Sequence, residues 1–375
     1  MYILGIGRTK FGVLPESIPE MMYASIYRAL DDANMDVKEL DAIFVSNFIG
    51  DSSYNQAHLS SIASTLLPDT NLPSFRVEAA CAGGGVALHL GLNTLHKYKN
   101  ILVIGVEKMT DLGSMESLRS VCSATDLVLE QKEGLVFPAA GALVSQQYMK
   151  KNNVTLKDLN LVALKNHENA NLNPYAHFYG KKVTEDMINN SPVICSPLRL
   201  FDCSPNSDGA ASVIISSEKR NKRDVKVAAS EMATGNIHLA IENDITNFPA
   251  TRIAGEKAYK AAGITPKEIN FAEIHDGFTA MEMSSMEDLK LCKPGKAKEL
   301  VRNGVTKLNG ELPINMDGGL KANGHPIGAT GIAQIYELVA QLRGEAKKRQ
   351  VPGNIGLAYT FGALVGSASV HILRG

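Results

Sequence analysis

One of the five cysteines in this 375-residue chain stands where a nucleophile would be useful. Cys81 follows a strand-like run that begins at Phe75, and the small residues Ala82–Gly85 separate it from a helical pattern. A sharp strand-to-helix turn exposes a nucleophile, and the N–H groups of a helix N-terminus stabilise a thiolate and lower its pKa. The alternative is a buried structural cysteine, the usual fate of a free thiol. Because helices avoid glycine, the glycines after Cys81 favour catalysis.

Two histidines stand where an acid–base group could reach a substrate. His325 lies in the glycine-rich stretch 315–331, and Pro326 fixes the backbone directly after it. A phosphate-cradling loop is the competing interpretation, but the Lys-Ser/Thr pair of a P-loop is missing. His275 follows the strand-like run Ile269–Ile274, at the strand end where α/β sheets bind ligands. A surface histidine at a strand end explains this second motif equally well.

The closing segment and the other cysteines complete the candidates. Thr360, Phe361 and Gly362 are expected in a loop before the final strand, where the backbone N–H of Gly362 could bind an oxyanion. A simple hairpin turn is the alternative there. The remaining cysteines are not followed by glycines at the start of a helix, and we interpret them as structural. They are Cys122, Cys195, Cys203 and Cys292.

Short buried strands and helices alternate along the chain and would position these residues. Apolar runs predict strands at 42–45, 101–106, 213–215, 225–229, 355–358 and 369–373. Helical patterns lie between them, at 19–33, 85–96, 251–262 and 329–342. This alternation predicts an α/β fold with mostly parallel sheets.

An internal repeat relates the two halves of the sequence. When the sequence is compared with itself at one constant offset, Ala29 corresponds to Ala258 and Lys38 to Lys267. Each of the two matching stretches contains a helix, a turn and the start of a strand. Any helix–turn–strand unit could converge on such residues, but the glycines that open two further helices recur in the same order. We therefore predict a duplication, with a site where the two halves meet.

The predicted halves are residues 1–217 and 225–375, separated by a charged, polar segment at 216–224. We interpret that segment as a solvated loop. Within the first half, residues 112–200 are irregular and contain four prolines. An insertion of this length could act as a lobe that covers a substrate.

The composition excludes several classes of protein. The chain has 38 Lys+Arg and 39 Asp+Glu, so phosphate neutralisation cannot drive binding to nucleic acid. No apolar run is long enough to span a membrane, and the start of the chain is apolar before it is basic, unlike a signal peptide. The five cysteines form no CxxC pair, so neither a disulfide framework nor a zinc site is predicted. A reducing cytoplasm fits best.

The motifs occur in the order of the thiolase superfamily, which the chain resembles over essentially its whole length. They are Cys81 with AGGG, HDGF at 275–278, the highly specific GHPIGATG at 324–331, and FGALVG at 361–366. Residues 165–178 and 197–215 look like sterol-carrier-protein-type and archaeal-type thiolases. The resemblance implies the thiolase fold: two pseudo-symmetric α/β halves in a five-layer αβαβα arrangement, with an insertion lobe over coenzyme A.

The resemblance also implies roles for matching residues. Cys81 would take the acyl group as a thioester, and His325 would accept the thiol proton and help to hold an oxyanion. His275, which stands where biosynthetic thiolases have asparagine, would polarise the carbonyl of the second thioester. The backbone N–H groups of Cys81 and Gly362 would form the other oxyanion hole.

Three further residues are implied to bind substrate, and two positions depart from the family pattern. The substrate residues are His167, Gly324 and Thr360. Most thiolases have a proton-transferring cysteine where this chain has Thr360, whose hydroxyl is too weak an acid or base to replace it. Some sterol-carrier-type members instead carry a cysteine in an HDCF motif, and Gly277 occupies that place here. Both known positions for a second catalytic cysteine are therefore empty.

The resemblance predicts an acyl-CoA acyltransferase that forms a Cys81 acyl-enzyme and catalyses reversible Claisen condensation and thiolysis of 3-ketoacyl-CoA. The missing second cysteine leaves alternatives: a non-thiolytic acyltransferase, a decarboxylating ketosynthase-like enzyme, a retro-aldol lyase, or a partner-dependent subunit. A homodimer or dimer of dimers is implied, together with a small zinc-ribbon/OB-fold companion. Coenzyme A thioesters would be substrate and product, so neither a bound cofactor nor a metal is expected.

Overall fold

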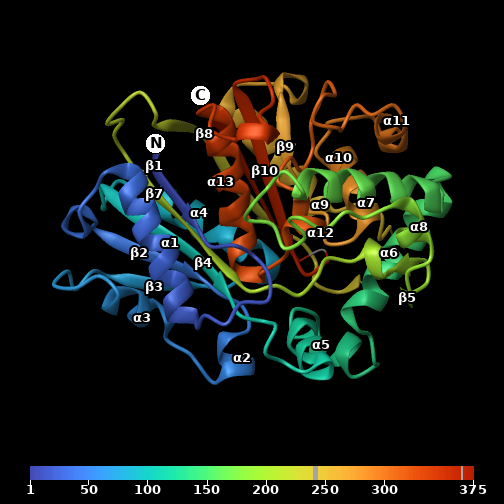
Figure 1. Cartoon of the computed structure of the whole chain (residues 1–375), viewed down its shortest axis with the longest axis horizontal. Helices are drawn as coiled ribbons and strands as arrows, with labels where there is room; N and C mark the ends of the chain where they lie inside the picture. The colour runs from blue at the N-terminus through green and yellow to red at the C-terminus, as the bar shows by residue number, and fades with distance from the viewer. Residues whose placement is uncertain (240–243, 365) are drawn as a thin grey trace.

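A computed structural model describes residues 1–239, 244–364 and 366–375 of the chain. Its centre is a nine-stranded sheet with the order β3-β2-β4-β7-β1-β8-β11-β10-β9 (Figure 1). The strands are β1 (Tyr2–Arg8), β2 (Ala42–Ser46), β3 (Ser74–Val77), β4 (Asn100–Glu107), β7 (Gly209–Ser216), β8 (Val225–Thr234), β9 (Phe271–Glu273), β10 (Ile355–Gly362) and β11 (Ser367–Arg374). A separate small sheet pairs β5 (Val193–Cys195) with β6 (Leu198–Arg199).

The helices lie around this sheet. They are α1 (Ile18–Ala33), α2 (Gly50–Tyr54), α3 (Leu59–Thr65), α4 (Gly83–Asn93), α5 (Ser114–Cys122), α6 (Phe137–Asn152), α7 (Leu156–Ala170), α8 (Glu185–Asn189), α9 (Pro249–Ala262), α10 (Thr279–Asp288), α11 (Ala297–Arg302), α12 (Gly319–Asn323) and α13 (Thr330–Leu342). Each helix and strand predicted from the sequence is present, whereas β1 and most of the other helices, α6, α7 and α10 among them, were not predicted. In the described part of the chain, none of the helices has the length and apolar character of a membrane span.

The two halves of the sheet repeat one pattern, as the internal repeat predicts. β2 runs parallel to β4, which pairs antiparallel with β7, which pairs antiparallel with β1. In the other half, β9 runs parallel to β10, which pairs antiparallel with β11, which pairs antiparallel with β8. The repeated sequence stretches form α1 with β2 and α9 with β9.

The prediction of mostly parallel sheets is wrong, because the sheet is mixed. Among the named strands of the described residues, the parallel pairs are β2–β3, β2–β4 and β9–β10. Parallel neighbours need a long crossover connection, and only residues 363–366 separate β10 from β11. The short connection therefore forces these two strands to pair antiparallel.

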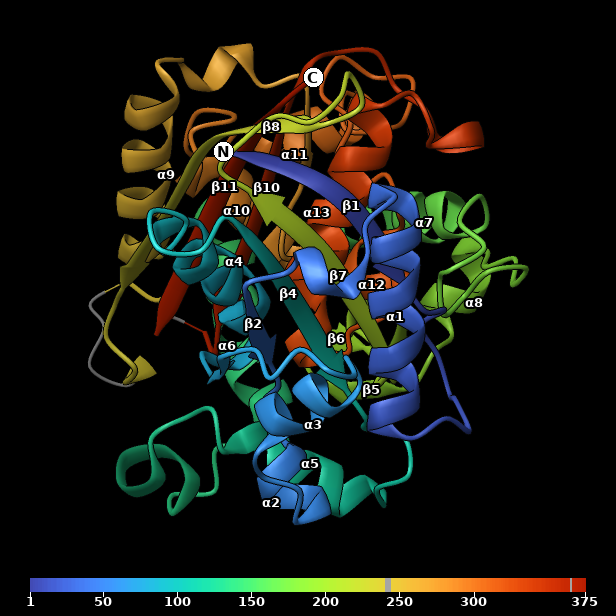
Figure 2. The ribbon, with the colours of Figure 1, turned by 90° about the vertical axis from the view of Figure 1, so that its left-hand side faces the viewer.

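Helices α4 and α13, one from each half, pack together against the sheet. On the opposite face of the N-terminal half lies α1, with buried side chains such as Met22 and Ile26 (Figure 2). α4 contacts α13 at their N-terminal ends. A β-carbon at Gly331 would lie 2.5 Å from the backbone N of Gly85, so only glycine permits this approach. The contact matters because Cys81 precedes α4 and His325 precedes α13.

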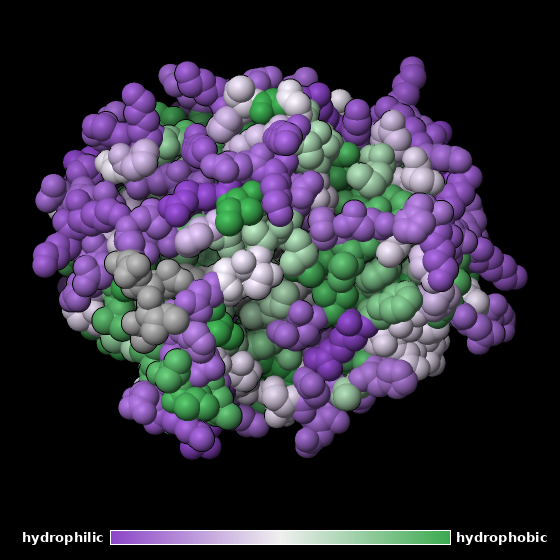
Figure 3. All heavy atoms as spheres, turned by 180° about the vertical axis from the view of Figure 1, so that it is seen from behind, coloured by the Kyte–Doolittle hydropathy of each residue, from purple (hydrophilic) through white to green (hydrophobic). Residues whose placement is uncertain are grey.

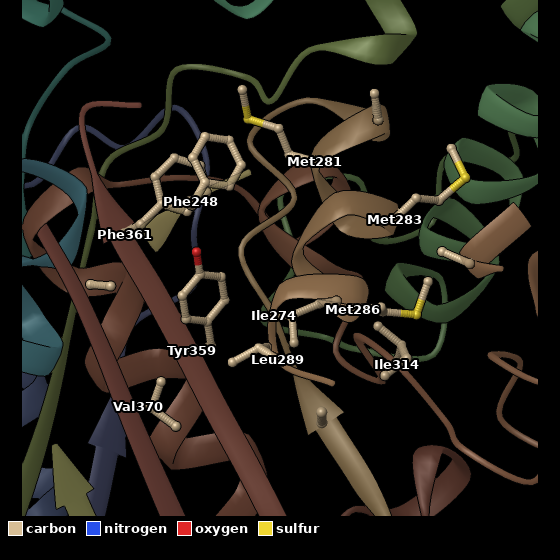
Figure 4. Close-up of a cluster of buried hydrophobic side chains, with 14 of the residues drawn as sticks. Phe248, Ile274, Met281, Met283, Met286, Leu289, Ile314, Tyr359, Phe361 and Val370 are labelled. Atoms are coloured by element: carbon tan, nitrogen blue, oxygen red, sulfur yellow. The ribbon is translucent and has the colours of Figure 1, made fainter. Parts of the chain in front are cut away.

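The expected irregular lobe is largely helical. α6 and α7 pack on α10, and α7 also contacts α12, so this part of the segment belongs to the core of the C-terminal half. The centre of this core holds Met281, Met283 and Met286 of α10. Beside them, Phe361 of β10 packs on Phe248 (Figure 4). Farther from this core lies α5, at the lower edge of the molecule in Figure 1, and the π-helical turn Leu127–Gln131 follows it in the chain.

The outer part of the lobe exposes apolar side chains. They are Met115, Leu127, Val128 and Leu129. Seen from behind, apolar side chains gather at the lower left of a mostly hydrophilic surface, where this part of the lobe lies (Figure 3).

Candidate active site

The fold brings Cys81, His275 and His325 together from three separate segments. The Cys81 Sγ lies 3.3 Å from the Nε2 of His325. The Sγ and one ring nitrogen of each histidine all lie within 4.8 Å of one another. All three side chains line a cavity of about 490 Å³. The three side chains expected to do the chemistry thus share one space.

A strained turn presents Cys81. The residue before it, Ala80, has a φ of 46°, a left-handed conformation that side chains other than glycine rarely adopt. The Ala80 N–H donates to the Glu78 carboxylate over 2.6 Å, which holds the turn. Cys81 lies in the 3-10 turn Ala80–Ala82 that leads directly into α4. The predicted nucleophile turn is therefore present, and it stores about 1–3 kcal/mol of strain.

Burial decides the protonation of the pair. Burial, and after it the charge of Glu107, raises the pKa of the Cys81 thiol to about 12, against the opposing N–H groups of Cys81 and Ala363. Burial also lowers the pKa of His325 to about 3. The expectation that the helix start lowers the thiol pKa is wrong, because desolvation outweighs the local dipoles. At neutral pH the pair is a neutral thiol beside a neutral imidazole.

A hydroxyl fixes the tautomer of His325. The Thr330 Oγ1 donates to the Pro326 carbonyl over 3.0 Å and lies 2.7 Å from the Nδ1 of His325. A Thr330 hydroxyl that donates to this carbonyl presents its oxygen to His325 as an acceptor, and Nδ1 then carries the imidazole proton. Nε2 then faces Cys81 as an acceptor, which is the form a base needs.

His275 rests on an aromatic platform. Its ring centroid lies 4.1 Å from that of Phe361 and 5.4 Å from that of His325. Burial, and then the neighbouring His325, holds the pKa of His275 well below its usual value. Its Nδ1 is buried without a hydrogen-bond partner among the described residues. A β-carbon at Gly277 would lie 3.1 Å from its Nε2.

Two buried carboxyl groups, which the sequence did not reveal, hold these loops. The Asp276 carboxyl accepts the N–H of Leu320 over 2.6 Å and so joins the His275 segment to α12, which leads to His325. Burial raises the pKa of Asp276 to about 8. The Glu107 carboxyl accepts the N–H of Phe48 over 2.9 Å and that of Gly328 over 3.0 Å. Each acid follows or ends a strand, but nothing in its local sequence distinguishes it from a solvated strand-end acid.

The segment around Gly362 differs from expectation. Thr360, Phe361 and Gly362 belong to β10 and not to a loop. Beside its own N–H, the backbone N–H that holds down the pKa of the Cys81 thiol is that of Ala363, one residue after the expected Gly362. Thr360 is 1 % exposed, its hydroxyl lies 2.9 Å from that of Ser369, and it does not line the cavity. Because side chains alternate along a strand, Phe361 faces the cavity and Thr360 cannot.

Two other expected substrate residues lie outside the cavity wall. His167 is 1 % exposed and packs edge-on against Phe178 and Phe201. Its position on the buried face of α7 explains this, since α7 belongs to the core and not to a loose lobe. Gly324 has a φ of 107°, and a β-carbon there would lie 2.8 Å from the Ser207 hydroxyl. It supplies the turn before His325 and does not line the cavity.

Most of the cavity wall is apolar. The lobe contributes Leu118, Val121 and Phe137, and the C-terminal half contributes Phe278 and Met281. A wall of this kind excludes water and can hold an acyl chain beside the thiol.

Known proteins resemble both halves of the chain. Residues 1–219 match the family model described as "Thiolase, N-terminal domain", and residues 232–375 match "Thiolase C-terminal domain-like". An acetyl-CoA acetyltransferase of Methanothermobacter thermautotrophicus is 40 % identical, over 99 % of this chain and 98 % of the relative. Human sterol carrier protein 2 is 32 % identical, over 100 % of this chain and 71 % of the relative.

Solved structures share the fold. An Ltp2–ChsH2(DUF35) aldolase superposes with a TM-score of 0.84 at 23 % identity, covering 100 % of this chain and 97 % of the other. Human mitochondrial 3-ketoacyl-CoA thiolase superposes with a TM-score of 0.76 at 17 % identity, covering 100 % and 98 %. At these identities the likeness establishes the architecture alone.

Proposed function

The chain belongs to the thiolase family of acyl-transferring enzymes, and we propose that it transfers acyl groups from coenzyme A thioesters through a covalent Cys81 intermediate. The observation that carries this proposal is the 3.3 Å contact between the Cys81 Sγ and the acceptor nitrogen of His325, in the wall of an apolar cavity. The relatives named acetyl-CoA acetyltransferase support the same substrate class.

The first half-reaction needs only groups that are present. His325 Nε2 takes the thiol proton as the sulfur attacks the thioester carbonyl, and the bond to coenzyme A breaks with return of that proton to the leaving thiolate. The backbone N–H groups of Cys81 and Ala363, which both lower the pKa of the thiol, would stabilise the oxyanion. Because the resting pair is neutral, proton transfer accompanies attack and does not precede it.

For the second half-reaction, we propose reversible Claisen condensation and thiolysis of a 3-ketoacyl-CoA, with His275 as the group nearest to the second thioester. His275 faces the same cavity, and its neutral imidazole can donate to a carbonyl or accept an α-proton. His325, in the same cavity, can hold the enolate oxygen once it carries a proton.

A second candidate follows from the missing cysteine. Thr360 faces away from the cavity, and Gly277 offers no side chain. These two observations favour an acceptor that needs no α-deprotonation, or a carbanion supplied by decarboxylation. A retro-aldol lyase is disfavoured by the retained Cys81–His325 pair.

Several properties of the assembly are part of the same proposal. The halves 1–217 and 225–375 would form a five-layer arrangement, with α4 and α13 as the central layer and residues 112–200 over coenzyme A. We expect a homodimer or a dimer of dimers, since β3 is an edge strand and leaves Phe75 exposed. The exposed apolar lobe suits a small zinc-ribbon/OB-fold companion, and the five free cysteines suit a reducing cytoplasm.

The test is intact-protein mass spectrometry after brief incubation with acetyl-CoA. The wild type should gain the mass of one acetyl group, and Cys81→Ser should gain none. Cys203→Ser is the matched control, because Cys203 lines the same cavity without a histidine partner. Acetylation that persists in Cys81→Ser, or is lost in Cys203→Ser alone, would contradict the assignment.

A further inference from the structure

The three catalytic side chains are also a set of ligands for a soft divalent cation. We propose that Cys81, His275 and His325 bind Zn²⁺ as a reversible inhibitory site. This inference goes beyond acyl transfer and does not depend on it, because it rests on the donor atoms and their spacing alone.

The spacing suits tetrahedral zinc. With zinc–sulfur bonds of about 2.3 Å and zinc–nitrogen bonds of about 2.0–2.1 Å, neighbouring ligand atoms lie roughly 3.3–3.6 Å apart. The Cys81 Sγ and the His325 Nε2 are already 3.3 Å apart. All three donors lie within 4.8 Å of one another, so small side-chain rotations bring His275 into range. Cysteine sulfur and histidine nitrogen are both ligands that zinc takes in proteins.

The surroundings of the two histidines leave both of them free to bind a metal ion. The Thr330 hydroxyl holds the proton of His325 on Nδ1 and so leaves Nε2 free to bind a metal. His275 is 3 % exposed and its Nδ1 has no hydrogen-bond partner among the described residues, so no internal bond must break when this ring turns. Because this unpartnered nitrogen belongs to a side chain that lines the cavity, it can bind a ligand held there.

Charge and space favour a cation here. Glu107 and Glu78 lie close enough to Cys81 for their negative charge to raise the pKa of its thiol, and the same charge attracts a metal ion. Binding replaces the thiol proton: Cys–SH and Zn²⁺ give Cys–S–Zn⁺ and one released H⁺. The cavity leaves a fourth position for water, as in zinc sites with an exchangeable ligand. A bound sulfur cannot attack a thioester, so zinc would inhibit.

Cobalt(II) is the probe, because a thiolate bound to it gives a near-ultraviolet charge-transfer absorption that needs no turnover. Titration of the wild type with CoCl₂ should produce this band, and ZnCl₂ should displace it. The band should be lost in Cys81→Ser and in wild type alkylated with iodoacetamide, but kept in the cavity-lining control Cys203→Ser. His275→Ala, with folding checked by thermal denaturation, should weaken cobalt binding by at least about 10–100-fold. That is the loss typical when a residue that only contacts a metal ligand is removed, and His275 is proposed to be a ligand itself.

Three results would overturn the proposal: no band at saturating cobalt, a band that survives in Cys81→Ser, or unchanged affinity in His275→Ala. The outcome is separable from the proposed acyl transfer. A cobalt band in a protein that acetyl-CoA does not acylate would remove the acyltransferase and keep the metal site. Acylation by acetyl-CoA without any cobalt band would remove the metal site and keep the acyltransferase.

Discussion

Replacing Thr330 with valine tests how His325 is made a base. Valine keeps the shape of threonine but lacks the hydroxyl that lies 2.7 Å from the Nδ1 of His325. Without this acceptor, a proton on Nδ1 has no partner in a fully buried position, so the imidazole gains by moving its proton to Nε2. That nitrogen then donates toward Cys81 and can no longer accept the thiol proton.

The size of the effect follows from the lost contact. Leaving a buried donor unpaired costs about 1–3 kcal/mol. If that cost falls on the reactive tautomer, the acylation rate drops by about 5–150-fold, since each 1.4 kcal/mol is about tenfold. The Pro326 carbonyl also loses the Thr330 hydroxyl as a donor but keeps the N–H groups of Ala329 and Thr330, so only a small decrease in the free energy of unfolding accompanies the kinetic effect.

Rapid-quench mass spectrometry would measure the single-turnover acylation rate. Thr330→Ser should restore most of that rate because it returns the hydroxyl. Thr251→Val is the matched control, since the Thr251 hydroxyl is also buried, 2.6 Å from the Tyr359 hydroxyl, but lies outside the cavity wall. It should lose stability and keep its rate. Wild-type acylation in Thr330→Val, or no rescue by serine, would refute the tautomer argument.

Three further substitutions probe other parts of the site. Gly277→Cys should increase acetoacetyl-CoA thiolysis by about tenfold or more, because its thiol would adjoin the Nε2 of His275; an equal rate in Gly277→Ala would show that the thiol is irrelevant. Gly141→Ala would place a β-carbon 2.2 Å from the Phe278 ring, so acylation by longer acyl-CoAs should fall more than by acetyl-CoA, and equal losses would argue against this. Burial lowers the pKa of His371 to about 3, below the 6.5 of the unfolded chain, so stability is lost as pH falls from 6.5 toward 3. In His371→Phe, the free energy of unfolding measured by urea denaturation should fall less steeply with decreasing pH, by up to roughly 1.4 kcal/mol per pH unit. An unchanged dependence of this free energy on pH would contradict the prediction.

Regular elements of the fold could be predicted because their patterns are local. The apolar runs at 101–106 and 355–358 and the helical patterns at 251–262 and 329–342 all appear in the structure. Strand direction could not be predicted, since it depends on which strands become neighbours. The burial of α7 was also missed, because its many asparagine and lysine side chains are satisfied only by distant partners, such as Lys165 by Glu282.

The chemical residues of the site were easier to predict than their supports. Cys81 and His325 have special neighbours in sequence, so their motifs are visible before folding. The roles of Ala363 and Glu107 depend on a backbone N–H and on a carboxyl that meet the site only after folding. Thr360 and His167 were misplaced because a motif gives position along the chain, but not which way a side chain faces.

Exchange of isotopically labelled coenzyme A into acetyl-CoA tests the covalent intermediate most directly. If Cys81 carries the acyl group, the wild type should catalyse this exchange with no second substrate present, Cys81→Ser should not, and Cys203→Ser should. Exchange that requires a second substrate, or that persists in Cys81→Ser, would show that the acyl group does not pass through this cysteine.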